Sequence, residues 1–125
     1  MRVLLDTNAL LWINQGTLAP PSVAALKDSA SIHVSAASIW EVEIKAANGK
    51  LKIDGDLIQA VHEAGFKPLA ITLEHSRAAG RLPLHHRDPF DRMLIAQAAI
   101  EKLTIATADR QFESYQVPLI GVARA

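Results

Sequence analysis

The segment that begins at Asp88 constrains the fold most, because it combines a clear helix start with one charge on a face that should be apolar. Asp88 followed by Pro89 predicts an N-cap and a proline at the first helical position, where a missing N–H costs nothing. Steps of three and four residues from Asp91 reach Leu94 and Ile95, so this carboxylate shares a face with side chains expected in the core. Asp88-x-x-Asp91 also fits a capping box with Asp in place of Glu, so capping alone would explain Asp91.

The composition predicts one domain over residues 1–125. Half of the residues are hydrophobic, the six glycines and six prolines are scattered, and no repeat or long linker divides the chain. The absence of cysteine excludes disulfides, thiol catalysis and cysteine-ligated zinc. Asp6 interrupts the first apolar run, which argues against a signal peptide, and no apolar segment is long enough for a membrane span. We therefore expect a soluble cytoplasmic protein with no membrane partner.

Strand-like and helix-like segments alternate along the chain. Short apolar or β-branched runs predict strands at residues 3–5, 31–35, 68–71, 103–107 and 117–120. Segments with helical periodicity lie at residues 9–13, 20–30, 38–47, 57–64, 72–79 and 89–99. This alternation predicts an α/β fold with a mostly parallel central sheet of about five strands flanked by helices. Pro118 favours an edge position for the last strand.

Acidic residues occur where predicted strands end and helices begin. Asp6 and Asp109 follow strands, Glu41 is in the helix after the second strand, and Asp91 is in the first turn of its helix. Since ligands of open α/β sheets bind beyond the carboxyl ends of the strands, these four acids could meet at one edge. Converging carboxylates repel one another unless a cation lies between them. An all-oxygen site indicates Mg²⁺ or Mn²⁺ rather than zinc, although helix capping explains each acid on its own.

Helical periodicity does not identify Glu41 as the functional acid of its helix. Glu43 falls among apolar neighbours, whereas Glu41 lies on the polar edge within pairing distance of Lys45. Ser38-x-x-Glu41 also has the spacing of a capping box. Periodicity, if anything, favours Glu43.

Basic residues and histidines surround the segment that begins at Asp88. The formal net charge is zero, so overall charge gives no argument for a polyanionic partner. Arg87 and Arg92 could contact phosphate, but a solvated basic surface is the simpler explanation. We expect the doublet His85-His86 to be a surface or substrate-contact element rather than a metal site, because adjacent side chains usually diverge.

Four segments follow one another with characteristic spacing: residues 4–8 (LLDTN), 35–41 (SAASIWE), 86–98 (HRDPFDRMLIAQA) and 107–112 (TADRQF). They resemble the signature segments of PIN-domain ribonucleases, in particular those of the VapC toxins of bacterial toxin–antitoxin pairs. The resemblance spans nearly the whole chain, and the third segment is long and specific. It implies a single PIN-like domain. Ala108 is a mild departure, because many relatives carry a polar or basic residue there.

By position, the resemblance implies an acidic quartet that binds the metal and carries out catalysis. Its members are Asp6, Glu41, Asp91 and Asp109, so the resemblance selects Glu41 over Glu43. Two residues match polar positions that help to order the site in relatives, Asn8 and Thr107. Three further residues are candidates for phosphate contacts: Lys45, Arg87 and Arg92.

The activity that the resemblance implies is metal-dependent hydrolysis of RNA phosphodiester bonds. One or two Mg²⁺ ions held by the quartet would activate a water molecule and neutralise the leaving oxygen. The chain would be an endoribonuclease toxin of a type II toxin–antitoxin pair, form a homodimer, bind a cognate VapB-like antitoxin and cut structured or single-stranded RNA. The alternative is a non-toxin PIN domain that binds RNA or a protein partner with little or no nuclease turnover.

Overall fold

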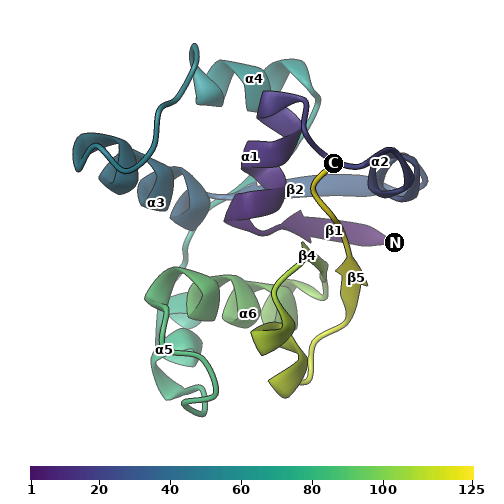
Figure 1. Ribbon diagram of the computed structural model, residues 1–125. Helices are drawn as coiled ribbons and strands as arrows, with labels where there is room; N and C mark the ends of the chain where they lie inside the picture. Colours follow the sequence, from purple (N-terminus) through teal and green to yellow (C-terminus); the bar gives the residue numbers. More distant parts are fainter.

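A five-stranded sheet forms the centre of the computed structural model, which describes residues 1–125 (Figure 1). The strand order is β3-β2-β1-β4-β5, and every neighbouring pair is parallel. The strands are β1 (Arg2–Leu5), β2 (Ser31–Ser35), β3 (Lys67–Leu69), β4 (Thr104–Thr107) and β5 (Leu119–Gly121). The predicted α/β fold with about five parallel strands is confirmed, including the edge position of the last strand.

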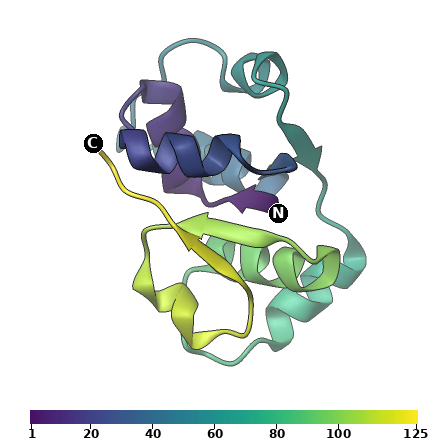
Figure 2. The same ribbon diagram turned by 90° about the vertical axis from the view of Figure 1, so that its right-hand side faces the viewer.

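Helices cover both faces of this sheet. They are α1 (Thr7–Gln15), α2 (Pro20–Lys27), α3 (Ala36–Ala47), α4 (Leu57–Glu63), α5 (Leu73–Arg81), α6 (Pro89–Glu101) and the short 3₁₀ helix η1 (Arg110–Ser114). Figures 1 and 2 show α1, α2 and α4 on one side of the sheet and α5 and α6 on the other. No helix combines the length and hydropathy that a membrane span requires.

Alternation along β1 divides the core between the two faces. Val3 and Leu5 belong to the same apolar cluster as Leu10 of α1, whereas Leu4 belongs to the cluster that contains Leu94 of α6. All three of these β1 side chains are fully buried. The strand is therefore apolar at every one of these positions, as expected when both faces of a parallel strand are covered by helices.

The connections place a topological switch between β1 and β4. The chain adds β2 and β3 on one side of β1 and then returns to add β4 and β5 on the other. At such a switch the segments that leave the carboxyl ends of the two strands diverge, and ligands of open α/β sheets bind in the resulting crevice. Asp6 directly follows β1 and Asp109 lies two residues beyond β4, so both acids are at this switch.

Polar residues at strand ends start the helices that follow. Asp6 caps α1 and Ser35 caps α3, and each side chain accepts a backbone N–H from the first turn. The predicted start of the second of these helices at Ser38 is wrong, because Ser35 already provides the cap and the helix begins at Ala36, two residues earlier than predicted. The capping box that was expected between Ser38 and Glu41 is absent. Glu41 therefore lies in the second turn of α3 with its carboxylate available for other contacts.

Candidate metal centre

Asp6 is held between the end of β1 and the first turn of α1. Its Oδ1 accepts the Ala9 N–H at 2.8 Å, and its Oδ2 accepts the Thr107 hydroxyl at 2.6 Å. Only 4% of the residue is exposed. Burial raises the pKa of Asp6, the two hydrogen bonds oppose that rise, and the charges of Asp109 and Glu41 add to it. Asp6 is thus a buried acid whose neighbours include two further acids.

Glu41 is buried on α3 and points toward the start of α1. Its Oε1 accepts the Thr7 hydroxyl at 2.6 Å, and its Oε2 pairs with Lys45 Nζ at 2.8 Å. The hydrogen bond from Lys45 to Glu41 raises the pKa of that ammonium, so Lys45 stays charged beside the carboxylate. The predicted pairing of Glu41 with Lys45 is confirmed.

The suggestion from periodicity that Glu43 is the inward-facing acid of α3 is wrong. Glu43 is exposed, whereas Glu41 is only 5% exposed. The reason is that the buried face of α3 carries small and polar residues, while the large apolar Trp40 and Ile44 face outward. A hydrophobic pattern therefore points to the wrong side of this helix.

Asp91 lies in the first turn of α6, and its side chain does not cap that helix. The cap is Asp88, whose Oδ1 accepts the N–H groups of Phe90 and Asp91 at 2.8 and 3.2 Å. Burial, together with the charges of Asp88 and Glu41, raises the pKa of Asp91 to about 7, although His86 opposes the rise. The capping explanation thus belongs to Asp88, and the Asp91 carboxylate is left for another role.

Asp109 caps η1 and is linked to Asp6 through one threonine. Its Oδ1 accepts the Gln111 N–H at 2.9 Å. Its own backbone N–H donates to Thr107 Oγ1 at 2.9 Å, and the Thr107 hydroxyl in turn donates to Asp6. Thr107 is buried, so it fixes the two acids that leave the neighbouring strands β1 and β4.

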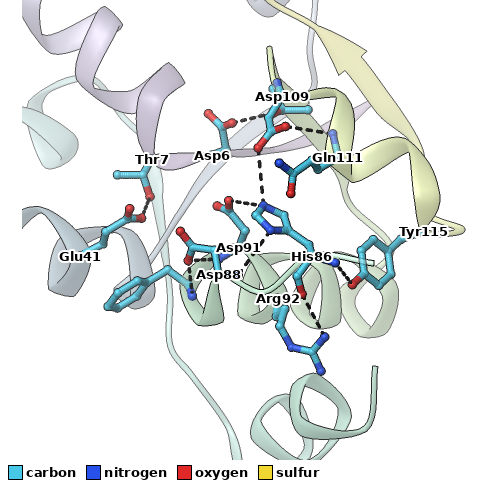
Figure 3. Close-up of polar contacts among 12 residues, drawn as sticks. Asp6, Thr7, Glu41, His86, Asp88, Asp91, Arg92, Asp109, Gln111 and Tyr115 are labelled. Carbon is cyan, nitrogen blue, oxygen red and sulfur yellow. Dashed lines mark hydrogen bonds and ion pairs between the residues drawn. The ribbon is translucent and has the colours of Figure 1, made fainter. Parts of the chain in front are cut away.

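His86 lies between Asp91 of α6 and Asp109, which follows β4. Its Nε2 lies 2.7 Å from Asp91 Oδ2 and 3.5 Å from Asp109 Oδ2. One ligand atom from each of these three residues lies within 4.8 Å of the others (Figure 3). Of the two alternatives for the histidine doublet, a surface or a substrate-contact element, the first fits the exposed His85 but is wrong for His86, which is buried. The two adjacent side chains do diverge: His85 faces solvent and His86 points into the protein.

The structure brings the four predicted acids to one edge of the sheet. Figure 3 shows Asp6, Glu41, Asp91 and Asp109 around the same region, and their charges affect one another: Glu41 and Asp109 raise the pKa of Asp6, and Glu41 raises that of Asp91. Lys45 is the one lysine or arginine that pairs with any of them. Several carboxylates and a single imidazole, with no cysteine in the chain, are a donor set that fits a hard divalent cation such as Mg²⁺ or Mn²⁺.

The other predicted site residues differ in exposure and in their contacts with the four acids. Asn8 is exposed in the first turn of α1, and Arg87 is exposed in the segment before α6 with no hydrogen bond or ion pair from its side chain. Thr107 orders the site, as described above. Two residues that the sequence analysis did not assign to the acidic site also contact the acids: Thr7, next to Asp6 in the first segment, and His86, at the start of the third.

The geometry gives Arg92 a role other than phosphate binding. Its Nη1 donates to the carbonyl oxygens of Pro83 and His86, and its Nη2 donates to those of Ala79 and Leu82, at distances of 2.9 to 3.3 Å. These four bonds use all four N–H groups of the two terminal nitrogens, which leaves only Nε–H. Arg92 therefore ties the end of α5 and the following loop to α6, and we do not retain it as a phosphate contact.

The family model of the PIN domain matches residues 3–118 of the chain. No curated protein is significantly similar in sequence. Among solved structures, VapBC2 from Rickettsia felis bound to a DNA fragment from their promoter has a TM-score of 0.68 at 16% identity, over 98% of this chain and 100% of that chain.

Two more solved structures share this fold over almost the full length of both chains. FitAcB from Neisseria gonorrhoeae has a TM-score of 0.63 at 22% identity, over 94% of this chain and 96% of that chain. A toxin-antitoxin complex from Klebsiella pneumoniae has a TM-score of 0.70 at 16% identity, over 94% of this chain and 95% of that chain. At these identities the likeness concerns the fold.

Proposed function

Because the chain belongs to the PIN domain family, we propose that it is a Mg²⁺-dependent endoribonuclease and the toxin of a type II toxin–antitoxin pair. The observation that carries the proposal is the meeting of Asp6, Glu41, Asp91 and Asp109 at one edge of the sheet. Two of these acids, Asp6 and Asp91, have raised pKa values, mainly because they are buried and in addition because neighbouring carboxylates repel their charge. Mn²⁺ could replace Mg²⁺, since both are hard cations that prefer oxygen ligands.

The toxin role is supported by structural neighbours of nearly equal length. They include a toxin-antitoxin complex and structures of VapBC2 and FitAcB, each matched over more than 90% of both chains. We accordingly propose a cognate VapB-like antitoxin and a homodimeric assembly as partners of this chain. An RNA is the proposed substrate.

The residues of the centre have two roles, to hold the cation and to fix the acids that hold it. The four acids would hold the cation, and Thr7 and Thr107 fix two of them by donating hydroxyl protons to Glu41 and Asp6. A bound divalent cation supplies the charge that lowers the pKa of an attacking water and stabilises the leaving oxygen of a phosphodiester.

Three basic or polar side chains would contact the RNA backbone. Lys45 is half exposed and neutralises Glu41, so it is placed to contact a phosphate beside the acids. Arg87 is exposed and unpaired in the segment before α6, and Asn8 is exposed at the start of α1. We propose these three side chains as substrate contacts, since phosphate groups are bound mainly by such side chains.

The direct experiment is RNA cleavage by the purified protein with Mg²⁺, with EDTA, and after Asp91→Asn. We expect cleavage with Mg²⁺ only, and none with the variant. Asp54→Asn is the matched control, because Asp54 is an exposed acid outside the centre. Full activity of Asp91→Asn would reject the proposal, and RNA binding without any cleavage by the wild-type protein would favour a binding module instead.

A further inference from the structure

His86 lies in the loop between α5 and α6 and is held there from several sides. Its backbone N–H donates to Tyr115 Oη at 2.9 Å, and that hydroxyl donates to the Pro83 carbonyl oxygen at 2.6 Å. Its own carbonyl oxygen accepts from Arg92 Nη1 at 3.3 Å. Its imidazole packs edge-on against the Phe112 ring, with centroids 5.9 Å apart. Because only 8% of the residue is exposed, the fold determines where the imidazole points.

The contacts of the two ring nitrogens define the tautomer of His86. The Asp88 N–H donates to Nδ1 at 3.3 Å, so Nδ1 carries a lone pair and the neutral ring has its proton on Nε2. Nε2–H then donates to Asp91 Oδ2 at 2.7 Å and faces Asp109 Oδ2 at 3.5 Å (Figure 3). A histidine that binds a metal through Nε2 needs its proton on Nδ1, where the Asp88 N–H would oppose it. The geometry therefore favours His86 Nε2–H as a hydrogen-bond donor to the carboxylates over His86 Nε2 as a metal ligand.

We infer that His86 is a positioning residue of the metal centre, whose Nε2–H fixes the carboxylate of Asp91 beside that of Asp109 without binding the cation itself. This inference rests on the proposed function, since it requires that these carboxylates bind a metal. Asp91 Oδ2 accepts from His86, while Asp91 Oδ1 accepts no hydrogen bond from the protein and is left for the cation. Hydrogen bonds of this kind orient metal-binding carboxylates and adjust their affinity.

The test compares Mn²⁺ binding by the wild-type protein, His86→Asn and His86→Gln, measured by titration calorimetry. A glutamine N–H reaches about as far from the backbone as Nε2 does, whereas asparagine reaches only as far as Nδ1. We expect His86→Asn to weaken Mn²⁺ binding by about 10- to 100-fold and His86→Gln to restore most of the affinity. The matched control is His62→Gln, an exposed histidine of α4, which should bind Mn²⁺ like the wild-type protein.

Pulsed EPR of the Mn²⁺-loaded wild-type protein distinguishes positioning from ligation. We expect no nitrogen nucleus directly bound to the ion. A bound nitrogen that disappears in His86→Asn would overturn the inference, because His86 would then be a ligand. Unchanged Mn²⁺ affinity in His86→Asn would also overturn it while leaving the proposed function intact. A wild-type protein that binds no Mn²⁺ would overturn the metal centre and the role of His86 together.

Tyr115→Phe provides a second variant in case the His86 variants do not fold. It keeps an aromatic ring in the core and removes only the hydroxyl that holds the His86 backbone. We expect Mn²⁺ binding to weaken by about 2- to 10-fold, because His86 loses one of its fixed contacts. Unchanged binding in a folded Tyr115→Phe variant would count against positioning by His86.

Discussion

Replacing Asp91 by asparagine should make the metal-free protein more stable while it removes the proposed activity. The pKa of Asp91 is raised in the folded protein, mainly by burial, from 3.8 to about 7. Below about pH 4 the group is protonated in both the folded and the unfolded states. Between pH 4 and pH 7 the unfolded chain loses this proton while the folded protein keeps it, so stability falls as the pH rises through this window.

The size of the effect follows from the same pKa values. A rise from 3.8 to about 7 corresponds to at most about 4 kcal/mol of lost folding free energy above pH 7. The Asp91 side chain is 17% exposed, so solvent screens part of this cost, and we expect about 1–2 kcal/mol. In Asp91→Asn the amide oxygen can still accept the His86 Nε2–H, so the variant loses the charge and keeps this hydrogen bond.

The assay is urea unfolding at pH 5 and pH 8 in EDTA, with Asp54→Asn as the control. We expect Asp91→Asn to be more stable than the wild-type protein by about 1–2 kcal/mol at pH 8 and by less at pH 5. The control should stay within about 0.5 kcal/mol, because Asp54 is exposed. In a second series without EDTA, saturating Mn²⁺ should stabilise the wild-type protein and Asp54→Asn by about 2.7 kcal/mol at one hundred times Kd, but not Asp91→Asn. An Asp91→Asn variant that is equally or less stable at pH 8 without metal would refute this account of the burial of Asp91.

Three further substitutions test other contacts of the centre. Asp88→Ala removes the oxygen that accepts two N–H groups of α6, so the free energy of unfolding should fall by about 1 kcal/mol. Asp88→Asn keeps an oxygen acceptor and should stay near the wild-type value. Equal free energies of unfolding for the two variants would argue against the cap. Arg92→Lys should cost about 2 kcal/mol and speed amide hydrogen exchange in the loop before α6, and unchanged exchange would contradict its role there. Thr107→Val removes the hydroxyl that links Asp6 and Asp109, so it should lower the free energy of unfolding by about 1–2 kcal/mol and weaken Mn²⁺ binding. The control is Thr104→Val, at the start of the same strand, and equal effects of the two substitutions would contradict the link.

The fold could be predicted from the sequence because local signals and topology agree. Val3, Leu4 and Leu5 form an apolar run that suits only a covered strand, and Asp88 with Pro89 starts α6 where expected. The least accurate boundaries were those of short edge strands. The sequence predicts the third strand at 68–71, whereas it spans Lys67–Leu69, because three residues carry too little periodicity to fix its ends.

The candidate site could be predicted only in part, since several of its contacts depend on tertiary structure. The family resemblance selects Glu41 over Glu43, while the apolar pattern of α3 favours Glu43 because Trp40 is exposed. His86 cannot be separated from its exposed neighbour by sequence, because the hydroxyl that holds its backbone belongs to Tyr115, 29 residues away. The same holds for Arg92, whose guanidinium binds carbonyl groups that are close only after α5 and α6 have packed.

The central claim is that carboxylates from four separate segments hold one divalent cation site. A crystal of the protein soaked in Mn²⁺ and measured at the manganese absorption edge tests it most directly. We expect an anomalous difference peak among the side chains of Asp6, Glu41, Asp91 and Asp109, and no such peak in crystals of Asp91→Asn. A well-ordered structure with no manganese peak among these four side chains would contradict the claim.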